Sequence, residues 1–158
     1  MVVKWTMVVP QFKKSTPSMN GGAQHSHPYG GQMDHGGSAI QEIHSKHEWR
    51  ILLEKNYGSN HLMVVDFTAL WCGPCKFFEP TIIEFALKFR DVTFVKIDVD
   101  VLPEVANDFN VTAIPAFVMI KEGKEIDKVV GVNKEAPEMK IEKHRSQGQQ
   151  HPLLLQHL

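Results

Sequence analysis

The only two cysteines of the chain, Cys72 and Cys75, stand where an apolar segment typical of a buried strand gives way to a helical pattern. At the start of a helix, residues three apart lie about one turn from each other, so their sulfurs come close enough to form a disulfide. A bridge that closes so short a loop adds little stability. The pair therefore indicates redox chemistry or metal binding rather than a structural staple, and it favours a reducing compartment.

The position of each cysteine on the helix predicts its role. Cys72 faces the unpaired N–H groups and the positive end of the helix dipole, which favour thiolate, so we expect it to be the attacking sulfur. Cys75 lies one turn further in with less solvent access and is expected to resolve a mixed disulfide formed at Cys72. Gly73 leaves room for a substrate, and Pro74 stiffens the turn.

Three other interpretations compete with a redox role for the cysteine pair. A zinc site needs four ligands, but the sequence has no second cysteine pair, and His61 and His144 stand in unmatched contexts. An inert coincidental pair is disfavoured because cysteine is rare here and the pair falls at a strand-to-helix junction. A purely structural local disulfide conflicts with the reducing compartment.

Two charged residues interrupt apolar strand patterns. Asp66 follows Val64 and Val65, and burial there raises the pKa of a carboxyl, which makes Asp66 a candidate acceptor for the Cys75 proton. The alternative of an outward-facing aspartate at a strand edge stays open. Lys96 either compensates Asp66 across the sheet or is an ordinary surface lysine, and the second is the default.

The 158 residues accommodate one domain. Residues 1–37 hold six of the eleven glycines and few large apolar side chains, so we expect a disordered extension; 38–145 form the globular domain and 146–158 a flexible tail. This extension, residues 1–37, is called the leader below; it has some features of an organelle transit segment but lacks arginine. Its histidines, as a metal tract, are a further hypothesis, the default being solvated tail residues.

Charge and hydropathy exclude several classes of partner. With a formal net charge of −1, nothing in the bulk composition attracts nucleic acid or an anionic membrane surface. No apolar run approaches the roughly 20 residues of a membrane span. We therefore expect a cytoplasmic protein, with organelle import through the leader as the alternative.

Periodicity predicts an α/β fold. Helices separate strands at 39–43, 62–67, 92–99 and 116–120, and a tight turn at 121–124 leads to a last strand at 125–130 and a final helix through Arg145. The first helix opens at the capping box of Ser45 and Glu48. Strands joined by helices pair in parallel and the last two antiparallel, which predicts a mixed sheet with helices on both faces.

Beyond this pattern, the chain resembles the thioredoxin family, and its plant h-type branch, over roughly residues 38–145. The resemblance rests on an active-site hexapeptide and flanking motifs, namely Trp71, Cys72, Gly73, Pro74, Cys75 and Lys76, with Asp66, Pro80, Asp98, Asp100, Ile114 and Pro115 around them. It implies that Cys72 is the nucleophile, Cys75 the resolving thiol and Asp66 the buried acid/base, with Lys96 as its neighbour.

The same resemblance implies a docking surface and a redox partner. Trp71 would cover the site, and Ile114 and Pro115, already a candidate cis-proline, would bind a substrate strand beside Gly131. Pro80 would bend the helix. The family carries no bound cofactor, is reduced by an NADPH-dependent thioredoxin reductase and reduces disulfide-containing target proteins. The expected function is thus a protein-disulfide reductase with a reversible Cys72–Cys75 disulfide.

Three positions depart from the family pattern: Leu70 before the tryptophan, Ala116 after the proline, and Pro137 near the start of the last helix. The first two bear on target preference. Pro137, if it falls beyond the first turn, costs about 3 kcal/mol of stability. Two other functions remain as hypotheses: a redox-inactive thioredoxin-fold binding or chaperone module, and an oxidase or isomerase, which the Gly73–Pro74 pair fits poorly.

Overall fold

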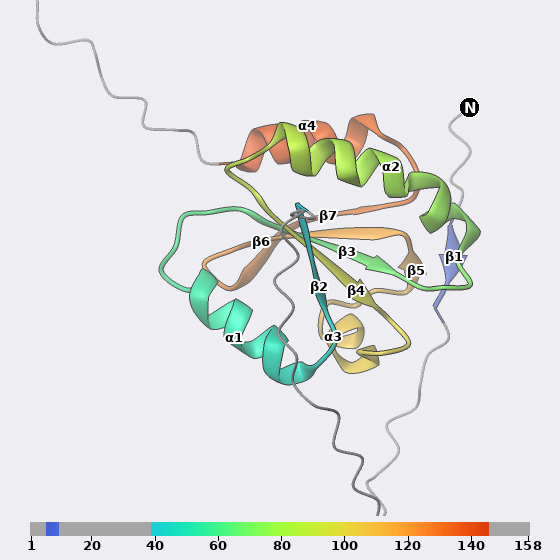
Figure 1. Ribbon diagram of the computed structural model, residues 1–158, viewed down its shortest axis with the longest axis horizontal. Helices are drawn as coiled ribbons and strands as arrows, with labels where there is room; N and C mark the ends of the chain where they lie inside the picture. The colour runs from blue at the N-terminus through green and yellow to red at the C-terminus, as the bar shows by residue number, and fades with distance from the viewer. Residues whose placement is uncertain (1–5, 10–38, 146–158) are drawn as a thin grey trace, which may run out of the picture.

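The computed structural model describes residues 6–9 and 39–145 and has a five-stranded sheet at its centre (Figure 1). The strands lie in the spatial order β2–β4–β3–β6–β7. Strands β2, β4 and β3 run parallel, whereas β6 is antiparallel to β3 and β7 to β6. The mixed sheet predicted from the sequence is confirmed, with bounds β2 Ile40–Ile43, β3 Met63–Thr68, β4 Thr93–Asp98, β6 Ala116–Lys121 and β7 Lys124–Val130.

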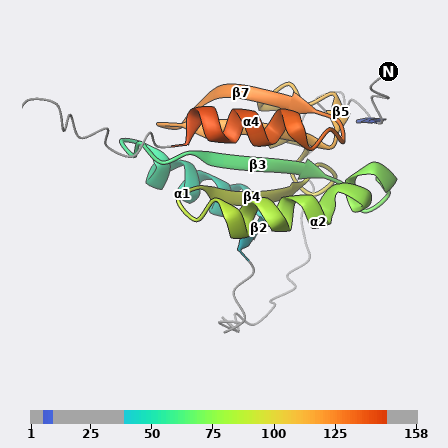
Figure 2. The same cartoon turned by 90° about the horizontal axis from the view of Figure 1, so that it is seen from above.

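Four helices cover the two faces of this sheet (Figures 1 and 2). Helices α2 (Gly73–Lys88) and α4 (Glu135–His144) lie on one face, and α1 (Lys46–Asn56) and α3 (Pro103–Asp108) on the other. Alternation along β3 supplies both cores, because successive side chains point to opposite faces. Val65 joins the cluster that includes Trp49 of α1, and Val64 the cluster that includes Phe78 of α2.

Local signals end and begin the elements where the sequence indicates. Ser45 Oγ accepts the N–H of Glu48 at 3.2 Å, and the Glu48 carboxylate accepts the N–H of His44 at 2.9 Å, so the predicted capping box forms. Glu122 and Gly123 both have positive φ, 51° and 73°, which is the backbone of a tight turn between antiparallel strands. These two signals set the start of α1 and the β6–β7 hairpin.

The two prolines within helices have different consequences. Pro80 lies inside α2, where it lacks the N–H of an intrahelical bond, and α2 changes direction along its length (Figure 1). Pro137 is the third residue of α4, and the first bond of that helix runs from Glu138 N–H to the Lys134 carbonyl. A backbone N–H at this position would have no intrahelical acceptor, so proline breaks no hydrogen bond here and the possible loss of about 3 kcal/mol does not occur.

The leader contains a strand that the sequence analysis did not predict. Met7–Val8 form β1, which pairs antiparallel with β5 (Ala113–Ile114), a short strand outside the main sheet. The prediction of disorder over 1–37 is therefore wrong for residues 6–9, because consecutive apolar side chains there have a strand edge and an apolar cluster to pack on. The rest of the leader with its histidines, and the tail at 146–158, lie outside the described residues.

Asp127 of β7 fastens α4 to the sheet. Lys140 Nζ lies 2.5 Å from Asp127 Oδ1, and His144 Nε2 lies 2.8 Å from Oδ2. Burial opposes ionisation, but these hydrogen bonds outweigh it and lower the pKa of Asp127 from 3.8 to about 2. Because the folded pKa is the lower one, the carboxylate stabilises the fold above pH 4, and this contribution is lost as the pH falls towards 2.

We therefore expect Asp127→Asn to lower the free energy of unfolding at pH 7 by about 1–2 kcal/mol, and by about half of that at pH 3. Urea denaturation at both pH values measures this. Glu142→Gln on the same helix removes only a half-exposed pair with Arg145 at 3.4 Å and should change stability by less than about 0.5 kcal/mol. Equal losses for the two variants would contradict the role given to Asp127.

Candidate active site

Cys72 and Cys75 are joined by a disulfide at the start of α2, with their Cα atoms 5.3 Å apart. Strand β3 ends at Thr68, and Cys72 is the N-cap of α2, so the turn after the strand carries the sulfur to the helix N-terminus. Cys72 Sγ accepts the N–H of Cys75 at 3.2 Å. This N–H and the helix dipole both favour negative charge on the Cys72 sulfur. Pro74 occupies the first turn, where its missing N–H costs nothing.

The relative exposure of the two cysteines differs from the sequence-based expectation. Cys72 is 0% exposed and Cys75 is 7% exposed, so the prediction that Cys75 has less solvent access is wrong for this arrangement of the chain. Cys72 belongs to a buried apolar cluster that also contains Ile114 of β5 and Val9 of the leader. Cys72 is buried because distant parts of the chain pack together at the start of α2. The spacing of the two cysteines does not predict this burial.

Asp66 lies on the sheet face that α2 covers, because it follows Val64 by two residues in β3. Strand β3 is flanked by β4 and β6, so the alternative of an aspartate at a sheet edge is excluded. Asp66 Oδ1 is buried with no hydrogen-bond partner among the described residues. Burial raises the pKa of Asp66 from 3.8 to about 7; the positive charge of Lys96 opposes this shift and the negative charge of Glu79 adds to it.

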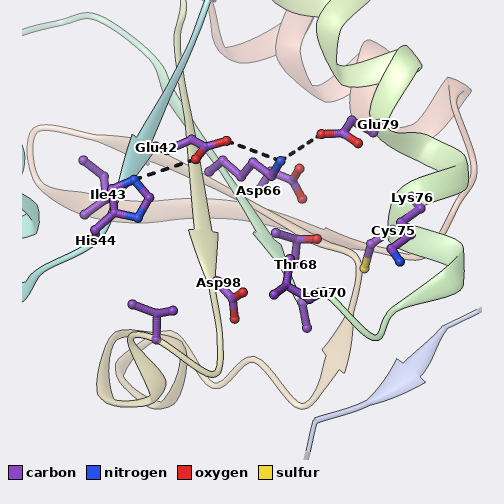
Figure 3. Close-up of a pocket in the computed structure, with 13 residues that line it drawn as sticks. Glu42, Ile43, His44, Asp66, Thr68, Leu70, Cys75, Lys76, Glu79 and Asp98 are labelled. Carbon is purple, nitrogen blue, oxygen red and sulfur yellow. Dashed lines mark hydrogen bonds and ion pairs between the residues drawn. The ribbon is translucent and has the colours of Figure 1, made fainter. Parts of the chain in front are cut away.

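Asp66 and Cys75 line the same pocket beneath α2 (Figure 3). The pocket is also lined by Lys76 and Glu79 of the helix, and of the two cysteines Cys75 is the one that lines it. A carboxyl that is half-protonated near neutral pH can accept a proton from a thiol and return it. The pocket thus brings together the two groups that such a transfer needs.

One row of side chains crosses the sheet beside Asp66. Lys96 of β4 is the register partner of Asp66, and Glu42 of β2 is the partner of Lys96 on its other side. Lys96 Nζ lies 2.8 Å from Glu79 Oε1 and 3.6 Å from Glu42 Oε1. Lys96 is therefore no ordinary surface lysine: two other carboxylates hold its ammonium group, and it acts on Asp66 through its charge.

Sequence reasoning missed Glu42 and Glu79. Glu79 follows Cys75 by four residues and so stands on the same face of α2, a spacing that could have identified it. Glu42 had no comparable local signal, since its place in the row depends on the pairing of β2 with β4.

The segment 113–116 meets the cysteines through Ile114 and Ala116, which belong to the same buried cluster. The Ile114–Pro115 peptide bond is cis, as the sequence suggested, and Ile114 is fully buried in the cluster that holds both cysteines. Gly131 donates its N–H to the Pro115 carbonyl at 2.9 Å with φ at 106°, a conformation that favours glycine. The structure therefore brings Pro115 and Gly131 together and places Ile114 with the cysteines.

Exposed apolar side chains lie around the site. Trp71 is 41% exposed and donates its indole N–H to Asp100 Oδ2 at 2.7 Å, which fixes the ring beside the turn after β4. Leu70 is 81% exposed, and Val101 is also exposed. Leu70 is thus free to contact another protein, whereas Ala116 is fully buried and is not available for such contact.

Two features are absent from the described residues, namely a metal-binding cluster and a membrane-spanning helix. Among residues 6–9 and 39–145, no three His, Cys, Asp or Glu side chains are grouped to hold a metal ion. Within the same part of the chain, no helix has the length and apolar character needed to cross a membrane.

A cysteine pair at a helix N-terminus, with a buried carboxyl in the adjoining pocket and a cis-proline in the segment that packs on the pair, is the arrangement of a thiol–disulfide oxidoreductase. The model of the family described as thioredoxin matches residues 41–143, and the chain belongs to the thioredoxin family. It is a protein-disulfide reductase that works through a reversible Cys72–Cys75 dithiol–disulfide cycle.

The relatives are plant h-type thioredoxins. Thioredoxin H2 of Arabidopsis thaliana is 49% identical over 109 residues, which are 69% of this chain and 82% of the relative. Thioredoxin H2-1 of Oryza sativa subsp. japonica is 42% identical over 81% of this chain and 94% of its own length. The crystal structure of thioredoxin NaTrxh from Nicotiana alata superposes with a TM-score of 0.67 at 44% identity and covers 78% of this chain and 99% of that one.

The role of Glu79 can be tested through the pKa of Asp66. In Glu79→Gln the negative charge that raises this pKa is gone, and Lys96 loses its 2.8 Å partner, so its charge acts more strongly on Asp66. We expect the pKa of Asp66 to fall by roughly half a unit to one unit, measured by NMR titration of the carboxyl carbon in the disulfide form. The control is Glu84→Gln, also in α2, which removes the partner of Lys134 and should leave the pKa of Asp66 unchanged. A raised pKa in Glu79→Gln would contradict this electrostatic account.

Proposed function

We propose that Cys72 is the attacking sulfur and Cys75 the resolving one. The Cys72 thiolate attacks a target disulfide, forms a mixed disulfide and releases one target thiolate. Cys75 then loses its proton to Asp66 and attacks the Cys72 sulfur, which releases the second target thiolate. The target gains two electrons and the chain ends with the Cys72–Cys75 bond. The supporting observation is the Cys72 sulfur at the N-cap of α2, with Asp66 in the pocket behind Cys75.

Lys96 neither donates nor accepts a proton in this reaction and acts instead as a positioning residue. Its charge opposes the effect of burial on the pKa of Asp66, which keeps that pKa near 7. At neutral pH the carboxyl is then divided between its two forms, as proton acceptance from one thiol and return to another require.

The proposed docking surface surrounds the disulfide. A target segment lies in extended form along Ile114 and Pro115, whose backbone Gly131 braces, while Gly73 and Pro74 leave space at the sulfur and Trp71 covers it. The exposed Leu70 would contribute an apolar contact in place of the residue usual in the family.

The proposed electron donor is an NADPH-dependent thioredoxin reductase, in a reducing compartment such as the cytoplasm, because both cysteines belong to the redox pair and none remains for structural bridges. The reductase would return the disulfide to the dithiol. The chain itself then needs no bound cofactor.

Reduction of insulin coupled to NADPH oxidation tests this proposal. With thioredoxin reductase present, the chain should support continuous NADPH consumption, and either protein alone should not. Reduction driven by dithiothreitol but not by the reductase would refute the proposed partner. A reduction potential near −270 mV agrees with a reductase, whereas one near −180 mV would favour the isomerase hypothesis.

A further inference from the structure

The strand β5 has an edge that the leader of the same chain occupies. In the antiparallel register Met7 lies opposite Ile114 and Val8 opposite Ala113, and the N–H of Val9 donates to the Thr112 carbonyl at 2.9 Å. This edge ends directly at cis-Pro115. Figures 1 and 2 both show β1 beside β5, at the end of the molecule where α2 begins.

The side chains of the leader alternate as those of a docked strand do. Val9 is 7% exposed and belongs to the buried cluster that contains Cys72, Cys75 and Ile114, and Met7 packs against the same cluster. Val8, between them, is 78% exposed. Backbone pairing together with burial of every second side chain is the recognition pattern of a peptide added to a sheet edge.

Occupation of this edge has a consequence for the disulfide. Cys72 is 0% exposed while β1 is in place, and a sulfur of another protein has to reach it for exchange to occur. The edge of a strand can pair with only one further strand at a time. A target segment along Ile114 therefore needs the backbone groups that the leader now uses.

We propose that residues 6–9 are an internal competitor for the target-docking edge of β5 and lower the activity of the chain towards protein disulfides until a target displaces them. This inference rests on the proposed function, which assigns the edge to targets. The competing target is an extended segment with an apolar, β-branched side chain at the position that Val9 fills. Charged or helical segments would compete poorly.

The covalent connection makes such competition effective. Residues 9–39, which number 31, join β1 to β2, a contour long enough for release without separation from the domain. A segment tethered in this way is present at an effective concentration on the order of millimolar. Since β1 pairs over only two residues, its contact with the edge is short enough to yield to a target with a longer pairing.

Three variants test the proposal: a deletion of residues 1–9, Val9→Asp and Val8→Asp. The two substitutions place the same charge on adjacent residues, one buried and one exposed, so only Val9→Asp should release the strand. We expect kcat/KM for insulin to rise about three- to tenfold in the deletion and in Val9→Asp and to stay unchanged in Val8→Asp. The gain on bis(2-hydroxyethyl) disulfide, which cannot pair with a strand, should be smaller.

A peptide with the sequence of residues 1–12 supplies a second readout that does not depend on catalysis. Added to the deletion variant, it should shift the amide NMR signals of Ala113 and Ile114 and inhibit insulin reduction, and the same peptide with Val9→Asp should do neither. Equal insulin rates for the full chain and the deletion, with the deletion folded by circular dichroism, would overturn the proposal. So would equal effects of the two aspartate substitutions.

Failure of the two proposals can be told apart. If no form of the chain reduces insulin while the peptide still shifts Ala113 and Ile114, the leader docks as inferred but the proposed function fails. If insulin is reduced and the peptide shifts neither residue, the function stands and the internal competitor is excluded.

Discussion

Cys75→Ser is expected to stop turnover and to leave the chain covalently bound to its target. Cys72 still attacks the target disulfide, but no second thiol is present to attack the mixed bond, so the reaction halts at that stage. When the reduced variant is mixed with insulin without added reductant, a product of the summed mass should accumulate. Non-reducing electrophoresis and mass spectrometry detect this adduct, and dithiothreitol should cleave its disulfide bond.

The matched variant is Cys72→Ser, which keeps one thiol in the same helical turn. It should neither form the adduct nor reduce insulin above the rate of dithiothreitol alone, because the remaining sulfur is not the N-cap of α2. An adduct in Cys72→Ser but not in Cys75→Ser would reverse the assignment of the two sulfurs. If the natural chain reduces insulin no faster than either variant or dithiothreitol alone, the redox-inactive binding module is supported instead.

Asp66→Asn is expected to stabilise the fold at high pH while slowing the reaction. The unfolded carboxyl ionises near pH 3.8 and the folded one near 7. Below pH 3.8 both states are protonated and the group contributes nothing; between 3.8 and 7 stability falls as pH rises, because only the unfolded state readily releases the proton. Above pH 7 the full cost is present, and asparagine removes it.

The disulfide form of Asp66→Asn should therefore gain about 2–4 kcal/mol over the natural chain at pH 8 and close to nothing at pH 4, as measured by urea denaturation. Asp127→Asn supplies the control of opposite sign, since the pKa of that carboxyl is lowered. In the reduced form, release of the mixed disulfide should slow roughly tenfold or more near pH 7, because the proton acceptor is gone. A loss of stability at pH 8 would show that the Asp66 carboxylate is well satisfied in the fold.

Local chemistry explains why the helix start could be predicted from the sequence. The two cysteines, the capping box at Ser45 and the turn at Gly123 act through neighbours within four residues, so their spacing alone determines the geometry. The alternation in β3 likewise places Asp66 on the same face as Val64. The effect of Pro137 on stability depends only on where α4 begins, and α4 begins at Glu135, two residues before it.

The surroundings of Asp66 could not be predicted in the same way. Whether this aspartate lies at an edge or in the centre depends on β3 pairing with both β4 and β6, and the partners of Lys96 depend on β2 and α2. Such pairings join segments tens of residues apart, and no local period encodes them. The exposure expected for Cys72 was wrong for the same reason, since its burial involves residues as distant as Val9 and Ile114.

The amino-acid order by itself determined the redox pair, the strand and helix that carry it, and the kind of chemistry available, because each depends on short-range geometry that few residues impose. Only the tertiary structure decided that the Asp66 carboxyl is desolvated beneath α2 and that the leader pairs with β5 beside Pro115. Both follow from burial and register between distant segments, where many weak contacts act together and no single spacing in the chain reveals the outcome.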